Sequence, residues 1–582
     1  MASERGGGEG NREALLLAPG AASSSEDGAR ARAPVPVAAE VARHTVPTFW
    51  DEMRELSILS VPVALSTLAR LVIINTDTAF VGHLVPPPGG EGGTYLAAAS
   101  FANTWNQFLS NIVFAPGYAL NSLCSQAIGA GNKKLAGVWL QLAIVMTSAL
   151  CVPVLVGYVV TGPVVRLMVP EKDRIVAEYA QKFNMVSILV LWPMVLYMII
   201  RQYFQAMQIV TPAMVVSGLT VGFNYGMNAL FVPDDSPVAW GFEGSPFATF
   251  ISMLFQIGLF LAYTVWYMGS HKPYWGGWTW ESLERSRVSR FMKMVVPMAI
   301  GIVLENSGLQ LISFATGHIG QDNIAAHAVL SSLWGILWAA YWGMGLALQV
   351  RVGSYLGQGN VGGAKQVAKI SIVIVVIICF CAGLVSWVFA ARIAKIFSSQ
   401  PAVQKIVSDS MYALVLDYFF ACMALCAVNL LEAMAQNRIL AFTLSFGMWA
   451  VQVPFSLLFA FKLPHYKDSP VEGIWMGQVV GELFKMFVLW TYILRLDWDR
   501  MCREALERSE VAEQEETSDV ALEAQLEDAD EHFAEESAAI PLARSAILGH
   551  QTAEGMASSM SARTPSPFIG ATRSPKNVRR ID

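Results

Sequence analysis

Residues 115–134 read APGYALNSLCSQAIGAGNKK and residues 341–360 read YWGMGLALQVRVGSYLGQGN. Residues 115–132 of the first stretch align without a gap with residues 343–360 of the second, at a displacement of 228 residues. The matched positions are Gly117, Ala119, Leu120, Gly129, Gly131 and Asn132 in the first stretch, and Gly345, Ala347, Leu348, Gly357, Gly359 and Asn360 in the second. Both stretches are apolar and end in glycines, which favour the end of a helix and a turn of the chain. We interpret the two stretches as duplicated copies of the same helix end and not as a phosphate-binding loop.

The composition indicates that this helix lies in a membrane. Hydrophobic residues make up 54% of the 582-residue chain and charged residues only 14%, against about 25% charged residues in soluble domains. Apolar runs such as 138–165 and 370–391 reach the roughly 20 residues that cross a bilayer as helix. We predict an all-α integral membrane protein with twelve spans, at 56–82, 96–123, 137–161, 177–200, 203–231, 246–268, 292–317, 324–350, 367–390, 405–431, 440–461 and 473–495.

Further matches indicate that the whole membrane region is duplicated. VGHL at 81–84 corresponds to TGHI at 316–319, and YFQAMQ at 203–208 corresponds to LLEAMA at 430–435. We predict a six-helix bundle at 51–270, a cytoplasmic linker at 271–290 and a second six-helix bundle at 291–498. Because each copy has an even number of spans, the copies are parallel repeats, and a central cavity is expected between them.

The two ends of the chain differ from the membrane region. Residues 1–50 and the acidic segment 499–582 are of low complexity, and we predict that both are mostly disordered. Lys and Arg in the short loops favour cytoplasmic termini, with Arg201 assigned to one of these loops. The first fifty residues contain no apolar segment typical of a cleaved secretory signal. The plasma membrane and the membrane of an acidic organelle are both compatible with this topology.

The sequence contains no motif of a soluble enzyme. The seven cysteines lie mostly in apolar segments and lack the polar neighbours of a zinc site. Neither a nucleotide-binding loop nor a nucleophile with its base is evident. We therefore expect a monomer that is not an enzyme, with no cofactor, no metal and no nucleic-acid partner, and in contact with membrane lipid.

Two carboxylates lie inside predicted spans, Asp77 in VIINTDTAFVG and Glu305 in PMAIGIVLENSGLQ. An acid there costs roughly 2.5–3.5 kcal/mol on insertion scales and is a functional candidate by default. A carboxyl group that is removed from water can exchange a proton near neutral pH, as a proton-coupled carrier requires. The alternative is a structural role, in which Arg70 pairs with Asp77. No cation lies on the turns next to Glu305.

Other polar and aromatic residues are candidates for the interior. Asn224 and Asn228 share one helical face and could coordinate a cation, relay a proton or simply join two helices. Candidates for the substrate cavity are Asn306, Gln310, Trp338, Tyr341 and Trp342, because aromatic faces bind organic cations, although Trp and Tyr also mark membrane interfaces. Asp417, Asn429 and Glu432 are further interior candidates, and Arg438 could pair with Glu432.

Several motifs together resemble the multidrug and toxic compound extrusion (MATE) family, within the multidrug/oligosaccharidyl-lipid/polysaccharide flippase superfamily. They are DTAFVGHL at 77–84, GYALNSLCSQAIGAGN at 117–132, RQYFQAMQIVTP at 201–212, GFEGSPFATFIS at 241–252 and GIWMGQVVG at 473–481. The resemblance covers residues 55–495. It implies secondary antiport, in which an ion gradient drives export of an amphipathic organic cation, a xenobiotic or a metabolite.

The resemblance also implies roles for particular residues. Asp77, Asn224, Asn228 and Thr249 match the cation site of the family's first lobe, and Glu305 matches the proton-coupling acid of its second lobe in eukaryotic members. Two stretches depart from the family pattern. LENSGLQ at 304–310 replaces L-E-W-W-x-x-E, which predicts a more polar second pocket, and EAMAQNR at 432–438 lacks the expected R-G pair.

We therefore expect proton-coupled export by alternating access, with H⁺ exchanged for the substrate. Sodium coupling through Asp77, Asn224, Asn228 and Thr249 is one alternative. A lipid-linked oligosaccharide flippase is another, although few Lys or Arg lie inside the predicted spans. A third alternative is a non-transporting receptor or scaffold that uses the acidic tail.

Overall fold

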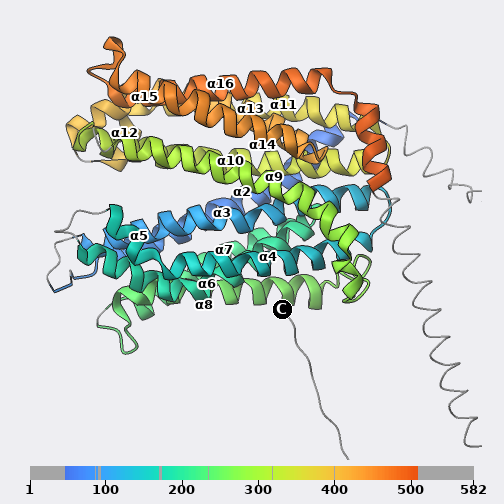
Figure 1. The fold of residues 1–582 in the computed structure, drawn as a ribbon, viewed down its shortest axis with the longest axis horizontal. Coiled ribbons are helices and arrows are strands. Elements are labelled where there is room, and N and C mark those ends of the chain that lie inside the picture. The colour runs from blue at the N-terminus through green and yellow to red at the C-terminus, as the bar shows by residue number, and fades with distance from the viewer. Residues whose placement is uncertain are drawn as a thin grey trace, which may run out of the picture.

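The structure is a computed structural model that describes residues 46–85, 87–88, 93–168, 174–233, 235–316, 319–398 and 400–508. Within these residues the chain forms long helices and no strand (Figure 1). The disorder predicted for the two ends concerns residues that lie mainly outside this described part.

The first half of the chain forms six long helical units and one short helix. The units are α2 (Phe49–Gly82), α3 (Thr94–Gly129), α4 (Leu135–Val159), α6 (Arg174–Ala206), α7 (Thr211–Phe231) and α8 (Gly244–Leu261), which the π-helix η3 (Ala262–Tyr267) extends. The short helix is α5 (Thr161–Met168), and a 3-10 turn, η2 (Gly241–Glu243), precedes α8.

The second half repeats this arrangement after the 3-10 turn η4 (Trp280–Leu283). Its units are α9 (Arg285–Ala315), α10 (Gln321–Gly357), α11 (Val361–Val388), α13 (Pro401–Ala433), α16 (Pro470–Arg495) and a composite of α14 (Asn437–Phe446), η6 (Gly447–Gln452) and α15 (Val453–Phe461). The short elements are α12 (Ala390–Phe397) and η7 (Pro464–Tyr466). In the described residues, each predicted span therefore corresponds to one long helical unit.

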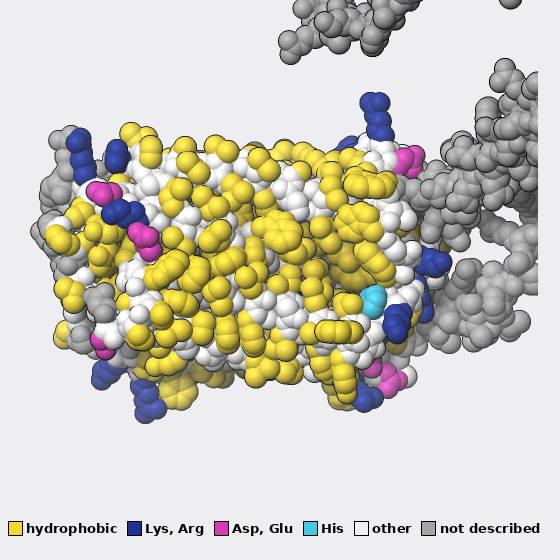
Figure 2. Space-filling model, turned by 90° about the horizontal axis from the view of Figure 1, so that it is seen from below, with side chains coloured by type: hydrophobic (Ala, Val, Ile, Leu, Met, Phe, Trp, Pro, Cys, Tyr) yellow, Lys and Arg dark blue, Asp and Glu magenta, His cyan; other side chains and the backbone are white. Residues whose placement is uncertain are grey.

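The helices are those of a membrane protein. Nine of the described spans are long and apolar enough to cross a bilayer, whereas α3, α7 and α16 are more polar. In α7 the two interior amides Asn224 and Asn228 reduce the hydropathy. Figure 2 shows a flank covered by hydrophobic side chains, with charged side chains gathered toward its two ends. Lipid is the solvent that suits such a flank.

The two halves lie side by side, one above the other in Figure 1. They meet mainly where α10 of the second half packs along α2 and α3 of the first, and where α9 of the second half packs along α3. Each half thus places its first long helix against the second long helix of its partner. This reciprocal contact is what two parallel copies of one unit produce around a shared axis.

The two opening stretches end helices, as predicted. α3 ends at Gly129 and α10 at Gly357, and the following turns contain Gly131 with φ +91° and Gly359 with φ +77°. Only glycine adopts such a left-handed conformation without a steric penalty.

These two helix ends also pack against each other, which the sequence did not predict. A Cβ atom on Gly129 would lie 2.1 Å from the backbone oxygen of Ser354, and one on Gly357 would lie 2.1 Å from that of Gln126. The glycines therefore allow the backbones of α3 and α10 to approach closely. The repeated motif holds the two halves together at one end of the molecule.

Polar contacts close the same end. Arg351 of α10 donates from Nε to Oε1 of Glu52 at 2.7 Å and from Nη2 to Oε2 at 2.5 Å, and Glu52 of α2 is buried. The Tyr355 hydroxyl donates to the same carboxylate at 3.0 Å. Gln126 donates to the backbone oxygen of Ala433 at 2.6 Å. A bidentate Arg–carboxylate pair and these bonds join the first half to the second.

The predicted segment boundaries need small corrections. α2 begins at Phe49, within the predicted tail, because Thr48 accepts a hydrogen bond from the backbone of Asp51 and caps the helix. α9 begins at Arg285, within the predicted linker. A helix at 498–508 occupies the start of the predicted tail and packs on the second half, where Cys502 donates to the backbone oxygen of Leu356.

A substitution tests the close contact between α3 and α10. Gly129→Ala adds a Cβ where no space exists, and overpacking of this kind costs about 1–3 kcal/mol. We expect the thermal unfolding midpoint of the purified protein to fall by a few degrees. Gly218→Ala in α7 is the matched control, because nothing lies within 4 Å of its new Cβ and alanine favours a helix. Equal midpoints for the two variants would contradict the packing described.

Candidate functional site

Helices α2, α7 and α8 bring Asp77, Asn224, Asn228 and Thr249 into one cluster. Asn228 donates from Nδ2 to Oδ1 of Asp77 at 2.7 Å, and Asn224 donates to the same oxygen at 3.2 Å. The Thr249 hydroxyl donates to Oδ2 at 2.7 Å. Both asparagines are fully buried, on one face of α7 as predicted. The four residues that the family resemblance assigns to the cation site of the first lobe therefore share a single hydrogen-bond network.

This network favours a charged carboxylate. Three donors point at Asp77 from two other helices, and hydrogen bonds to an ionised acceptor are stronger than those to a neutral one. The Oδ1 atom of Asn228 is buried and has no hydrogen-bond partner among the described residues. In this cluster the carboxylate of Asp77 therefore has hydrogen-bond donors on both oxygens, whereas the amide oxygen of Asn228 has none among the described residues.

Arg70, the alternative partner for Asp77, is not bonded to it. Its Nη2 atom contacts the sulfur of Met194 at 3.9 Å, and its guanidinium lies 5.7 Å from the centre of the Phe114 ring. No ion pair between described residues includes Arg70. A purely structural pairing of Asp77 with Arg70 is therefore not what the structure shows.

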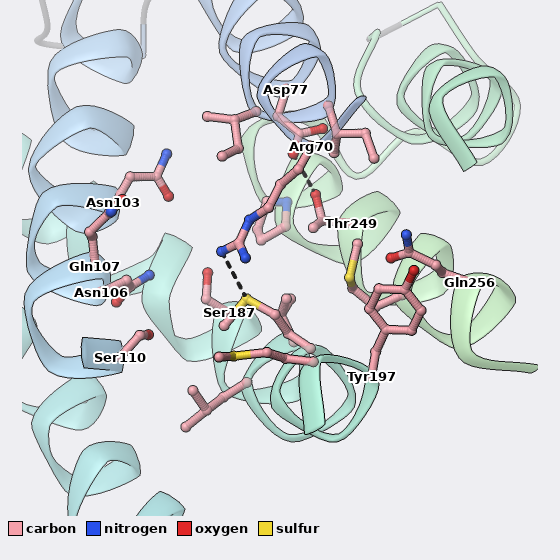
Figure 3. Close-up of a pocket in the computed structure, with 18 of the residues that line it drawn as sticks. Arg70, Asp77, Asn103, Asn106, Gln107, Ser110, Ser187, Tyr197, Thr249 and Gln256 are labelled. Carbon is pink, nitrogen blue, oxygen red and sulfur yellow. Dashed lines mark hydrogen bonds between the residues drawn. The ribbon is translucent and has the colours of Figure 1, made fainter. Parts of the chain in front are cut away.

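A cavity of about 210 Å³ lies beside Asp77 within the first half. Figure 3 shows Arg70 extending from α2 into this cavity, with Asn103, Asn106, Gln107 and Ser110 of α3 along another wall. α6 and α8 supply most of the remaining lining, with aromatic rings, methionines and polar groups, and Tyr158 of α4 and Ser217 of α7 complete it. Such a mixture of an apolar wall and a few polar groups is typical of a small-molecule site.

The five predicted substrate-cavity residues do not line this cavity. Asn306 donates to its own helix, at the backbone oxygen of Ile302. Tyr341 is buried and its hydroxyl accepts from Asn429 at 3.0 Å. Trp342 stacks on Trp338 with ring centres 4.8 Å apart. The remaining candidate, Gln310, is partly buried on α9.

Trp342 also contacts the other half, because its ring meets the Tyr118 ring edge-on at 5.7 Å. Through Trp342, the stacked aromatic pair of α10 thus reaches the boundary between the halves. The sequence predicts a central cavity between the two halves, so a role of these residues in that cavity stays a prediction.

The second half contains a charged cluster around Glu305. Lys485 of α16 donates to Oε1 of Glu305 at 2.9 Å, and its Nζ atom also lies 2.6 Å from Oε1 of Glu482. Lys485 is buried. Asp417 of α13 is buried as well and close enough for its charge to interact with Glu482 and Lys485. One lysine therefore neutralises part of a group of three carboxylates.

Lys485 and Glu482 were not predicted from the sequence. A signal was present, because the two residues stand three positions apart inside an apolar run and so share one face of a helix. The turns next to Glu305 carry no cation, whereas Lys485 reaches it from 180 residues away in the chain. Similarly, Arg201 was assigned to a loop but lies in α6, which continues to Ala206, and lines the cavity.

Glu432 and Arg438 do not form the predicted ion pair among the described residues. Asn437 begins the next helix after a turn at Ala435, which has φ +60°. This turn separates the two side chains.

The sequence profile described as MatE matches residues 62–230 and 297–458, which together exceed half of the chain. The chain belongs to the MATE family. The two matched segments fall one in each half, so the profile finds the duplicated unit independently of the opening motif. Asp77, Asn224 and Asn228 lie in the first matched segment and Glu305 in the second.

Curated relatives of this MATE transporter are similar over most of their length. Multidrug and toxin extrusion protein 2 of Mus musculus is 28% identical over 471 residues, which cover 80% of this chain and 78% of that protein. Multidrug and toxin extrusion protein 1 of Xenopus tropicalis is 26% identical over 466 residues, which cover 79% of this chain and 77% of that protein.

Solved structures show the same fold. The crystal structure of the eukaryotic MATE transporter AtDTX14 matches with a TM-score of 0.71 at 21% identity, over 79% of this chain and 99% of that one. The outward-facing conformation of a multidrug resistance MATE family transporter matches with a TM-score of 0.66 at 17% identity, over 80% of this chain and 100% of that one. The predicted two-lobed, twelve-helix architecture is confirmed for this MATE transporter.

Proposed function

We propose that this MATE transporter is a secondary antiporter that exports an amphipathic organic cation or metabolite in exchange for protons by alternating access. The observation that carries the proposal is the partly buried carboxylate of Asp77. It accepts three hydrogen bonds and forms part of the wall of a cavity. A carboxylate in that position can bind either a proton or a cationic substrate.

Protonation of Asp77 changes both the charge and the hydrogen bonds of the cluster. A neutral carboxyl no longer attracts a cation, and its hydroxyl oxygen is a poorer acceptor for the amides of Asn224 and Asn228. Proton uptake therefore weakens substrate binding and rearranges α2 against α7 and α8. Loss of the proton on the other side of the membrane restores affinity for the substrate.

Alternating access requires the closed end of the molecule to open. In our proposal both termini are cytoplasmic, which makes the end that contains Glu52, Arg351 and the α3–α10 glycine contact the cytoplasmic end. Opening toward the cytoplasm separates the Glu52–Arg351 pair and the two glycine-lined helix ends. The membrane itself is either the plasma membrane or that of an acidic organelle, and the functional unit is a monomer.

Glu305 provides a second proton-coupling group in this proposal. Its carboxylate is 2.9 Å from Lys485, so it can gain a proton only when Lys485 turns fully toward Glu482 or Asp417. Proton binding at Glu305 is thereby coupled to a movement of α16 against α9.

Replacement of Glu305 tests this second role. Glu305→Gln preserves the shape of the side chain but cannot be ionised, and we expect proton-driven efflux of a cationic dye to fall several-fold. Efflux is measured in proteoliposomes with an imposed pH gradient. Efflux at the full rate would eliminate Glu305 as a coupling group and leave it as the counter-ion of Lys485.

The proposal as a whole is tested by the choice of gradient. Purified protein is reconstituted into vesicles loaded with a cationic dye, and either a pH gradient or a sodium gradient is imposed with the membrane potential clamped. Efflux that follows the pH gradient alone is the expected result. Efflux that requires sodium and ignores pH would contradict proton coupling.

Sodium coupling remains the second candidate because of one observation. The Oδ1 atom of Asn228 is a buried oxygen without a partner among the described residues, and Na⁺ binds carboxylate and amide oxygens. Three donors already converge on Asp77, however, and occupy three of the roughly four lone-pair sites of its carboxylate. Proton coupling is therefore the better-supported proposal.

A lipid-linked oligosaccharide flippase is less compatible with the cavity. Its volume is about 210 Å³, whereas an oligosaccharide of several sugar rings on a lipid is far larger than a single amphipathic cation. A much larger oligosaccharide would require a different cavity.

A further inference from the structure

The cavity beside Asp77 contains more positive than negative charge. Its described lining includes two arginines, Arg70 of α2 and Arg201 of α6, and a single carboxylate, Asp77. The other lining residues are uncharged polar or apolar side chains. A cavity built only for cations would not contain two guanidinium groups, since these repel a cation and cannot lose their protons.

Neither arginine has a carboxylate partner in the part of the chain that the structure describes. Arg70 makes its hydrogen bond to the weakly accepting sulfur of Met194 and lies over the Phe114 ring. Arg201 lies over the Tyr197 ring at 5.9 Å, and its Nε atom is buried without a hydrogen-bond partner there. No ion pair in the described residues includes either side chain.

The two arginines also act on each other. Their charges are close enough to interact, and both are positive. Isolated charges inside a membrane protein are costly, and they normally face a water-filled cavity or a partner. An anion between the two guanidinium groups would offset this repulsion and supply acceptors for both side chains.

We propose that Arg70 and Arg201 form a subsite for the carboxylate of an amphipathic substrate, whose cationic end lies at Asp77. The proposal rests on the antiport function above and specifies the substrate class of the same cavity. Arg70 and Asp77 are seven residues apart on α2, so their Cα atoms are separated by roughly 10 Å along the helix. The apolar body of the substrate lies between its two charged ends, against the methionines and aromatic rings of α3 and α6.

This arrangement remains consistent with proton antiport. A proton on Asp77 competes with the cationic end of the substrate and leaves the carboxylate end bound to the arginines. The arginines therefore determine which compounds enter the cavity, whereas Asp77 determines when they leave. Arg70 and Arg201 are specificity residues in this proposal, and Asp77 is the coupling residue.

A matched pair of dyes tests the proposal. The probes are a rhodamine with a free carboxylate and its methyl ester, which differ in one negative charge and share the cationic ring system. Efflux of each dye is measured in proteoliposomes made of a zwitterionic phospholipid, under the same pH gradient. We expect the wild-type protein to transport the acid at least as fast as the ester.

Substitution of the arginines identifies the subsite. In Arg70→Gln and in Arg201→Gln we expect the ratio of acid to ester efflux to fall by about tenfold or more, as expected for the loss of a charge-assisted hydrogen bond. Arg70→Lys and Arg201→Lys retain the charge and should recover most of the ratio. Arg503→Gln is the matched control, because Arg503 is exposed on the helix at 498–508, outside the cavity.

The possible outcomes separate the two proposals. Transport of the ester without the acid by the wild-type protein would overturn the anion subsite and leave the antiport function in place. An unchanged acid-to-ester ratio in both glutamine variants would overturn the subsite as well and leave the arginines a structural role. Failure of the pH gradient to drive either dye would overturn the antiport function and, with it, the subsite.

Discussion

Asp77→Asn is expected to reduce pH-gradient-driven efflux to the level of protein-free vesicles. The substitution replaces one carboxylate oxygen with an amide nitrogen in a side chain of the same shape, so the side chain can no longer exchange a proton. The amide oxygen can still accept from Asn224 and Asn228, which both donate to Oδ1 in the wild-type protein, whereas the amide nitrogen presents a donor to the Thr249 hydroxyl in place of Oδ2. The variant therefore loses the exchangeable proton while it can retain two of the three hydrogen bonds of the network.

The control for this variant is Asp235→Asn. Asp235 is an exposed acid in the loop between α7 and η2, so the same chemical change there leaves efflux at the wild-type rate. Thermal unfolding of Asp77→Asn in detergent establishes that the variant is folded. Wild-type efflux in a folded Asp77→Asn protein would show that the carboxylate has no part in coupling.

Lys485→Met is expected to destabilise the protein more than Gly129→Ala does. Lys485 is buried and lies 2.9 Å from Glu305 and 2.6 Å from Glu482, with Asp417 near Glu482 and Lys485. Removal of one partner from a buried charge pair costs about 3–5 kcal/mol, because the remaining charge has no compensation. The measurement is the thermal unfolding midpoint in detergent over a range of pH.

The pH dependence of this deficit follows from the same charges. In Lys485→Met the remaining carboxylates favour their protonated form, so the variant should be closest to the wild type at acidic pH and furthest from it at alkaline pH. The double substitution Lys485→Met with Glu482→Met removes one charge of each sign and should recover part of the stability. Lys365→Met, at an exposed site on α11, is the matched control.

A deficit of the same size at every pH would contradict the charge interpretation of the Lys485 cluster. Such a result would assign the effect to packing of the lysine stem against Gly447 of η6, and not to an uncompensated carboxylate.

The duplication and the twelve-helix architecture could be predicted because both leave local signals. Long apolar runs identify spans in a membrane protein, and a gap-free repeat of Gly and Asn positions at a displacement of 228 residues identifies two copies. The i,i+4 spacing of Asn224 and Asn228 predicts that both amides lie on one helical face, whereas their grouping with Asp77 and Thr249 was implied by the family resemblance alone.

The contacts between distant helices could not be predicted in this way. The pair of Glu305 with Lys485 and the pair of Glu52 with Arg351 join residues 180 and 299 positions apart, and no periodicity in one sequence relates them. The glycines at 129 and 357 signal a helix end, but nothing local indicates that the two ends touch. Trp342 of α10 meets Tyr118 at the boundary between the halves, where the sequence predicts a central cavity, and the role of the aromatic residues in that cavity stays a prediction.

Proton release on substrate binding is the most direct test of the central claim, that Asp77 exchanges a proton for the substrate. If protonation weakens substrate binding, substrate binding must by linkage weaken proton binding to the same extent. Addition of a saturating cationic dye to purified transporter in a weakly buffered detergent solution is therefore predicted to release protons, detected by a pH indicator. Release is expected from the wild-type protein and from Asp235→Asn, and a markedly smaller release from Asp77→Asn. Equal release from the wild type and Asp77→Asn, or none from the wild type despite dye binding, would contradict the claim.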